Sequence, residues 1–287
     1  GDFSESYLAT LDEVSKAEKL AELSARLVQP YIIIAVILFA LIGLVKFSAL
    51  PELNFGTENS NSVDEKTSIT QYPQIILGAI ALFAYVGVEV IAGDTIGLYG
   101  ASLSVPNFSG LTSYTMVFMV LGYIIGVTCI PKYISQEKAL IGSAIAGSIC
   151  IFGVMFASTE STLIADILWG WSGIQVLPDT VTFVALMGLA HALVWPSIWP
   201  LALDGLGKFT KTASALLIMA ISGGAIIPPL YGRIVDANKH ELISSGLQEA
   251  DAMASASTSS YWILIPCYAI VLFFAVWGHK IKNWTKK

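Results

Sequence analysis

The chain has 287 residues, of which 55% are hydrophobic and only 13% are charged. Charged residues make up about a quarter of an ordinary soluble domain, so this composition excludes a soluble globular protein and predicts a polytopic membrane protein. The net charge of −6 argues against nucleic acid as a partner. The three cysteines show neither a disulfide framework nor a metal-ligand spacing, so we expect no cofactor and no metal.

Residues 1–29 are expected to form an extracytoplasmic amphipathic segment. Oppositely charged residues lie four apart, Asp12 with Lys16 and Glu22 with Arg26, as on the surface of a helix. The segment is too polar to span a bilayer, so it should lie along the membrane surface or pack on a neighbour. Its leucines recur at helical spacing: Leu8, Leu11, Leu20, Leu23 and Leu27.

Seven apolar runs follow, and each has the length of about 20 residues with which a helix crosses about 30 Å of hydrocarbon. A segment in lipid must satisfy its own backbone hydrogen bonds, so we predict an all-α fold with seven transmembrane helices. The alternating pattern of a membrane β-barrel is absent from the sequence. The runs cover residues 30–50, 74–98, 110–130, 139–157, 180–203, 212–232 and 260–279, to within a few residues.

Two connections between the runs have an informative composition. Residues 51–73, "PELNFGTENSNSVDEKTSITQYP", are rich in Ser, Thr, Asn and Glu, so they are expected to be a flexible linker between two bundles. Residues 158–177 carry Trp169 and Trp171, which fit the role of anchors at a membrane interface, and a short helix is expected there.

The distribution of lysine predicts how the chain crosses the membrane. The connections 99–109 and 158–179 contain neither Lys nor Arg, whereas the connections on the other side and the C-terminal tail are lysine-rich. Lysine-rich loops stay in the cytoplasm, so we expect a cytoplasmic C-terminus. The lysines on that side are Lys132, Lys138, Lys208, Lys211, Lys280, Lys282, Lys286 and Lys287.

Three stretches resemble the fucose–glucose/galactose symporter family, a bacterial sugar-transporting branch of the major facilitator superfamily. Residues 82–100, "LFAYVGVEVIAGDTIGLYG", resemble its seventh helix, which carries a Tyr-Val-Gly-x-Glu/Gln pattern. Residues 191–232, "HALVWPSIWPLALDGLGKFTKTASALLIMAISGGAIIPPLYG", resemble its tenth and eleventh helices. Residues 130–140, "IPKYISQEKAL", resemble its eighth-to-ninth loop. The resemblance extends over about residues 30–287.

This resemblance implies the C-terminal portion of a twelve-helix transporter. Residues 30–50 would be the last helix of the N-terminal bundle, residues 51–73 the cytoplasmic inter-bundle linker, and residues 74–287 the C-terminal six-helix bundle. The family's proton-coupling carboxylates lie on the first and fourth helices, which are not in this sequence. The missing N-terminal half of the same transporter is therefore an expected partner.

The resemblance also implies a function. It predicts a secondary active transporter in the bacterial inner membrane that moves a neutral sugar of the hexose, fucose or N-acetylglucosamine class by alternating access. The coupling ion would be H⁺, with Na⁺ as the alternative, and the protein would not be an enzyme. Two other classes stay open: a seven-helix receptor matches the helix count, and a polytopic intramembrane enzyme would need a catalytic cluster that no motif supplies.

Glu89 is the first candidate substrate-binding residue. A carboxylate in the middle of a spanning helix is costly unless it faces a wet cavity or a partner, so we expect Glu89 to line an aqueous path. Tyr85 and Gly93 lie one turn away on the same face, where a phenol and a bare backbone would suit sugar hydroxyls. The alternative is that Glu89 bonds a neighbouring helix and only fixes the packing.

Asp94 and two glycines form a second candidate group. Asp94 lies closer to the outer interface, where it would serve as a gate or helix-end residue. Gly93 and Gly97 flank it, and we expect them to let the helix bend during alternating access.

The fifth run supplies the remaining candidates. His191, Trp195 and Trp199 lie four residues apart, so in a continuous helix they share one face and could bind both the rim and the apolar face of a sugar. Pro196 removes a backbone donor and should bend the helix. The alternatives are an interhelical hydrogen-bonded His191 and tryptophans packed in a core.

Overall fold

The computed structural model describes residues 12–47 and 68–284 of the chain. Leu8 and Leu11 of the predicted amphipathic segment, the last three residues of the first apolar run, most of the predicted linker 51–73, and the terminal Lys286 and Lys287 lie outside the described residues. Within the described ranges all regular structure is helical, and seven helical segments are long and apolar enough to cross a membrane. The predicted all-α fold with seven candidate transmembrane helices is confirmed.

The chain divides into two units, and the first contains a single described helix, α2 (Glu13–Phe47). The predicted amphipathic segment and the first apolar run are therefore continuous, because α2 does not end at their boundary but passes through Pro30. Its polar first half is rich in Glu, Lys, Ala and Leu, which favour helix, and Glu22 pairs with Lys19 at 2.9 Å and Arg26 at 2.7 Å. At 1.5 Å per residue the helix is about 50 Å long, longer than the hydrocarbon layer.

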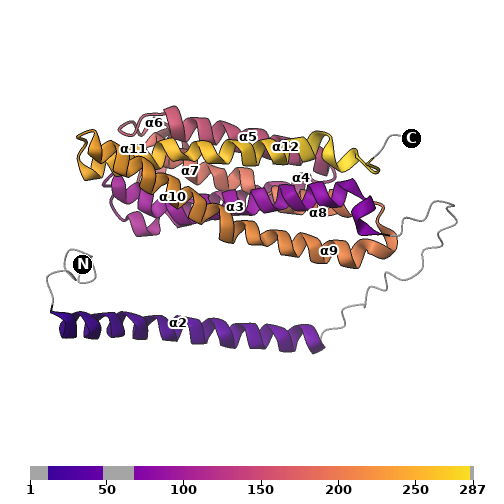
Figure 1. Cartoon of the computed structure of the whole chain (residues 1–287), viewed down its shortest axis with the longest axis horizontal. Helices are drawn as coiled ribbons and strands as arrows, with labels where there is room; N and C mark the ends of the chain where they lie inside the picture. Colours follow the sequence, from indigo (N-terminus) through magenta and orange to yellow (C-terminus); the bar gives the residue numbers. More distant parts are fainter. Residues whose placement is uncertain (1–11, 48–67, 285–287) are drawn as a thin grey trace. The chain divides into compact units, whose positions relative to one another are not determined.

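The second unit is a bundle of helices that run in roughly a common direction (Figure 1). Three of its six spans consist of two helices separated by a turn or a short 3-10 segment, which lie end to end as α7 and α8, α9 and α10, and α11 and α12. The helices are α3 (Pro73–Ser102), α4 (Thr112–Cys129), α5 (Gln136–Phe156), α6 (Leu163–Trp169), α7 (Asp179–His191), α8 (Val194–Leu203), α9 (Thr210–Met219), α10 (Gly223–Ser244), α11 (Glu249–Ser260) and α12 (Leu264–Val276).

Helix α3 is the central element of this bundle. It contacts α4, α7, α8, α10 and α12, and its sequence is apolar on all sides, as expected of a helix enclosed by others. Ile75, Leu82, Ile91 and Ile96 are fully buried along its length. Polar side chains on the buried faces of α3 are therefore placed among the neighbouring helices.

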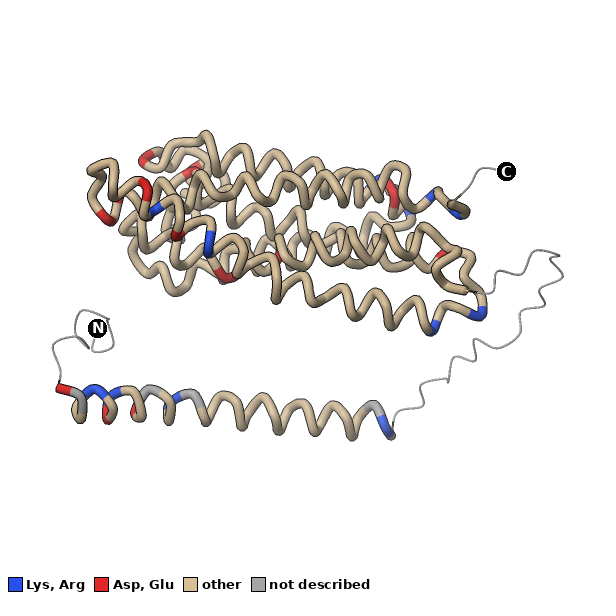
Figure 2. The backbone as a smooth tube through the Cα atoms, viewed as in Figure 1, with Lys and Arg blue, Asp and Glu red and all other residues tan. Residues whose placement is uncertain are grey.

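The lysine-bearing segments meet at one end of the bundle. Lys280 in the tail pairs with Glu137 at the start of α5 at 2.6 Å, and Lys282 pairs with Asp204 after α8 at 2.8 Å. Trp284 donates its indole N–H to the carbonyl oxygen of Thr70 before α3, at 2.7 Å. Figure 2 shows blue basic positions at the end of the bundle nearest the C-terminus. The contacts above show that three segments that the sequence places on the same side do lie together.

The connection 158–177 contains the expected short helix, α6, but its two tryptophans differ. Trp171 is 84% exposed, as an interfacial anchor would be, whereas Trp169 is only 8% exposed. The Trp169 ring packs 5.7 Å from that of Tyr114, and its N–H donates to the carbonyl oxygen of Gln175 at 3.0 Å. Trp169 therefore packs this connection against α4, and of the two tryptophans only Trp171 is exposed enough to be an anchor at the membrane interface.

Candidate functional site

The carboxylate of Glu89 lies half-buried in the middle of α3. Tyr85 precedes it by one turn and is buried, and its hydroxyl is close enough to the Glu89 carboxylate to interact with it electrostatically. The same hydroxyl donates to the backbone carbonyl oxygen of His191 at 3.1 Å. A hydroxyl carries one proton, so Tyr85 serves one of these two acceptors at a time. Glu89 and Tyr85 lie close together on one helix, and their role in binding stays a prediction.

The carbonyl of His191 is available to Tyr85 because the fifth span is interrupted. Helix α7 ends at His191 and α8 begins at Val194, with a turn between them. Pro196 has no N–H, so the carbonyl of Ala192 cannot accept the helical hydrogen bond that residue 196 would otherwise donate. The expected interruption of the helix thus lies just before Pro196, and it places a backbone acceptor next to the site.

His191 itself is fully buried, which differs from the expectation that its side chain lines a cavity. Its Nε2 lies 2.6 Å from the hydroxyl of Tyr268 on α12. Its Nδ1 has no hydrogen-bond partner among the described residues. In this conformation His191 belongs to the interior of the bundle, as the interhelical alternative expected, and it reaches the Glu89 region through its backbone.

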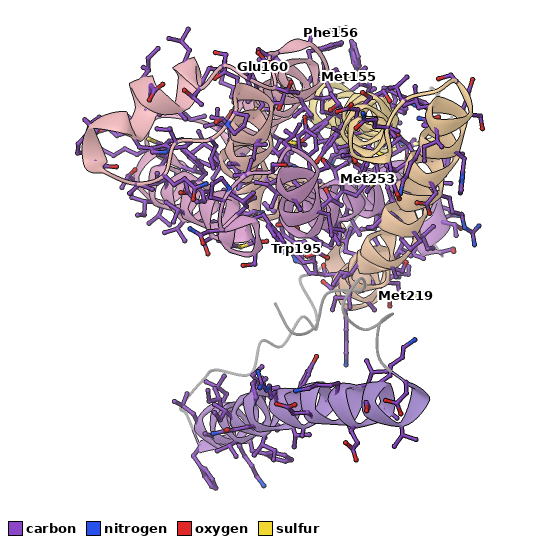
Figure 3. The ribbon with its side chains drawn as sticks, turned by 90° about the vertical axis from the view of Figure 1, so that its left-hand side faces the viewer. Met155, Phe156, Glu160, Trp195, Met219 and Met253 are labelled. Carbon is purple, nitrogen blue, oxygen red and sulfur yellow. The ribbon has the colours of Figure 1, made fainter. Side chains whose placement is uncertain are left out.

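Trp195 and Trp199 form a separate aromatic surface on α8. Their rings stack with centroids 5.6 Å apart and planes at 22°, and both are half-buried. Trp195 lies at the edge of the bundle, on the same side as Met219 and opposite Phe156 (Figure 3). A turn separates His191 from the two tryptophans, and His191 is fully buried whereas both tryptophans are half-buried. The predicted shared binding face of the three residues stays a prediction.

Gly93, Asp94 and Gly97 lie within an uninterrupted part of α3. Gly93 is buried, and its carbonyl oxygen accepts a hydrogen bond from the Thr112 hydroxyl at 2.9 Å. Asp94 is exposed. Their roles in gating or bending stay predictions, and this conformation shows α3 as one helix through all three residues.

Two tyrosines near Glu89 are absent from the sequence-based candidates. Tyr123 on α4 is 40% exposed, and Tyr268 on α12 is buried. Both hydroxyls are close enough to the Glu89 carboxylate to interact with it electrostatically. A tyrosine in the middle of an apolar run is the signal that would have found them. Among the described residues no group of three or more His, Cys, Asp or Glu is placed to hold a metal.

The resulting arrangement is a carboxylate with the phenols of Tyr85 and Tyr123 close to it, from α3 and α4. Tyr268 is buried and pairs with His191, and the stacked tryptophan pair on α8 is a separate aromatic surface. A carboxylate accepts hydrogen bonds, and phenols both donate and accept them. Such a set can bind a neutral polyhydroxylated molecule, whose hydroxyl groups need several acceptors and donors and whose C–H faces pack on aromatic rings.

Comparisons with known proteins point in the same direction. No family model matches the chain. The chain is similar to the glucose/galactose transporter of Brucella abortus, with 30% identity over 88% of this chain and 53% of that protein. It is also similar to the L-fucose-proton symporter of Haemophilus influenzae, with 31% identity over 79% of this chain and 49% of that protein. The chain thus spans about half the length of these curated relatives.

The fold is similar to a solved structure as well. The crystal structure of the major facilitator superfamily transporter FucP, in the outward conformation, matches with a TM-score of 0.65 over 98% of this chain and 61% of that one. The sequence identity is 18%, so this likeness concerns the fold.

Proposed function

This chain belongs to the fucose–glucose/galactose family of the major facilitator superfamily, and from that premise we propose that it is the C-terminal portion of a proton-coupled sugar symporter. Helix α2 would be the last helix of the N-terminal bundle, and the six spans from α3 to α12 the C-terminal bundle. The N-terminal half of the same transporter would complete the pathway. The named relatives are transporters, in keeping with the expectation that the protein is not an enzyme.

The proposal rests on the environment of the Glu89 side chain. A half-buried carboxylate lies in the middle of a spanning helix, beside the hydroxyl of Tyr85 and close to the partly exposed Tyr123. In hydrocarbon such a carboxylate would be strongly disfavoured. It is tolerated if this side of α3 faces an aqueous path through which a sugar passes.

Binding of a neutral sugar would depend on hydrogen bonds, since the sugar offers no charge. Glu89 would accept bonds from neighbouring hydroxyl groups of the sugar, and charge-assisted bonds of this kind are about twice as strong as neutral ones. Tyr123 would donate to a sugar oxygen. The Tyr85 hydroxyl, whose proton goes to the His191 carbonyl, would accept a bond from a sugar hydroxyl. Trp195 with Trp199 would cover an apolar face. The proton would be carried by carboxylates of the absent half, as the family resemblance implies.

A counterflow experiment tests this function. Proteoliposomes that contain the full-length transporter are loaded with unlabelled fucose, glucose, galactose or N-acetylglucosamine, and entry of the labelled sugar is measured. We expect at least one of these neutral sugars to exchange, and its addition to de-energised vesicles to alkalinise the medium. If no sugar exchanges although the protein is folded, the proposed function is wrong.

We further predict that the lysine-rich end of the bundle faces the cytoplasm. With Cys129 first replaced by Ser, the exposed positions 160 and 211 at opposite ends of the bundle can each receive a single cysteine, as Glu160→Cys and Lys211→Cys. A membrane-impermeant maleimide is expected to label position 160 in intact cells and position 211 only after permeabilisation. The reverse pattern would show that the orientation is inverted.

A further inference from the structure

Tyr268 has no place in the sugar site described so far, yet it is joined to it. It lies on α12, where it is 2% exposed, and its hydroxyl is 2.6 Å from Nε2 of the fully buried His191. The two rings stack with centroids 6.1 Å apart and planes at 18°. A short hydrogen bond between two buried side chains on distant helices fixes both of them.

The direction of this hydrogen bond follows from counting donors. A neutral imidazole and a phenol have one proton each. If His191 donated from Nε2, the Tyr268 proton would lack an acceptor and Nδ1 of His191 would lack a donor. If Tyr268 donates to Nε2, only the Nδ1 proton is left without a partner, and unpaired buried groups are costly. We therefore assign Tyr268 as the donor.

The same histidine also holds Tyr85. The carbonyl oxygen of His191 accepts the hydrogen bond from the Tyr85 hydroxyl at 3.1 Å, and the edge of one ring faces the other at 5.8 Å. The peptide unit that carries this carbonyl is held by α7 on one side, where the Ala192 N–H donates to the carbonyl oxygen of Gly188 at 3.2 Å, and a turn follows on the other. Anchoring the His191 side chain to Tyr268 adds a second constraint on where the His191 carbonyl, and with it the Tyr85 hydroxyl, can lie.

The ring of Tyr268 packs directly against helix α5 at Gly147. A Cβ atom at Gly147 would overlap the phenol ring and the hydroxyl of Tyr268. The ring therefore occupies a space that exists only because residue 147 is glycine. Its position is set by packing as well as by its hydrogen bond to His191.

We propose that Tyr268 is a positioning residue for sugar binding: through His191 it orients the Tyr85 hydroxyl next to the Glu89 carboxylate. This inference rests on the proposed function. Helix α12 would then affect the affinity for sugar through Tyr268, although we place no side chain of α12 in contact with the sugar. It also explains why His191 can be fully buried and still affect the site.

The test is Tyr268→Phe in the full-length transporter, which removes one oxygen and keeps the ring. We expect the Kd of the sugar that passes the counterflow test, measured by calorimetry on purified protein, to rise about three- to tenfold, as for the loss of one hydrogen bond. The matched control is Tyr231→Phe. Tyr231 is also buried, at 5% exposed, but its hydroxyl donates to the carbonyl oxygen of Ser257 at 3.2 Å. We expect the Kd of this control to stay that of the wild type.

A double-mutant cycle separates positioning from a structural role. In a Tyr85→Phe background, Tyr268→Phe should change the Kd no further, because the hydroxyl that it orients is gone. An equal additional loss in that background would overturn the proposal, and so would an unchanged Kd for Tyr268→Phe alone. A fall in melting temperature without a change in Kd would likewise show a purely structural role.

A second variant covers the case in which Tyr268→Phe does not fold. His191→Leu combined with Tyr268→Phe removes both polar partners, which is far less destabilising than leaving one unpaired. We expect the folded double variant to show the same rise in Kd, and wild-type affinity would overturn the proposal. If the wild-type protein binds none of the four sugars, it is the proposed function that fails and not the role of Tyr268 within it.

Discussion

Glu89→Gln in the full-length transporter is expected to lower sugar uptake about tenfold or more, since hydrogen bonds to a charged group contribute about 1.5–3 kcal/mol. The substitution keeps the size of the side chain and its contact with Tyr85 but removes the negative charge. An amide accepts through one oxygen only, so sugar hydroxyls lose acceptors. Initial rates of labelled sugar uptake, normalised to the amount of transporter in the membrane, measure the effect.

Two comparisons make this result specific to the site. Glu160→Gln makes the same chemical change at an exposed position outside the spans, and its uptake should equal that of the wild type. The melting temperature of purified Glu89→Gln should not fall, because burial of an amide costs less than burial of a carboxylate. Wild-type uptake by Glu89→Gln would remove Glu89 from the binding site and leave only its packing role.

The sequence predicts the membrane architecture well because that architecture depends on composition. Hydrocarbon requires long apolar helices, so each span is visible as a run of apolar residues. The ends are less well predicted. The last span, expected over 260–279, begins at Glu249, because α11 continues the helix with Ala, Ser and Thr residues that a hydropathy pattern does not register.

The sequence predicts which side chains are neighbours when both residues belong to one unbroken helix. Glu89 and Tyr85 are four residues apart in the continuous α3, and their side chains are close enough to interact electrostatically. The same spacing argument does not carry over to His191 and Trp195, because α7 ends at His191 and α8 begins only at Val194. A period of four residues is informative only while the helix is unbroken.

Contacts between helices are not encoded in any local pattern. Tyr268 and His191 are 77 residues apart in sequence and their side chains are 2.6 Å apart in the fold. Which face of α12 turns towards α7 follows from the packing of all six spans. Small residues give a partial signal: Gly122 and Gly126, four residues apart on α4, both lie against the turn between α7 and α8.

Helices α4 and α7 approach each other closely at Gly188. A Cβ atom there would overlap the backbone carbonyl of Thr115 and lie 3.2 Å from the backbone nitrogen of Met119. These are backbone atoms of α4, so they cannot move aside as a side chain would. In a membrane, packing of this kind rather than hydrophobic exclusion holds helices together. A single added methyl group at position 188 must therefore push α4 away from α7.

We expect Gly188→Ala to abolish most of the folded protein, since overpacking of a rigid contact costs about 3 kcal/mol, a large part of the total stability. Size-exclusion chromatography of a fluorescent fusion should show loss of the monodisperse peak. Gly142→Ala is the matched control: it lies inside α5 with nothing within 4 Å of the added atom, and the gain in helix propensity of about 0.5–1 kcal/mol should raise the melting temperature. A monodisperse Gly188→Ala protein with wild-type stability would show that α4 and α7 do not pack through residue 188, and the turn that presents the His191 carbonyl would then lack its support on α4.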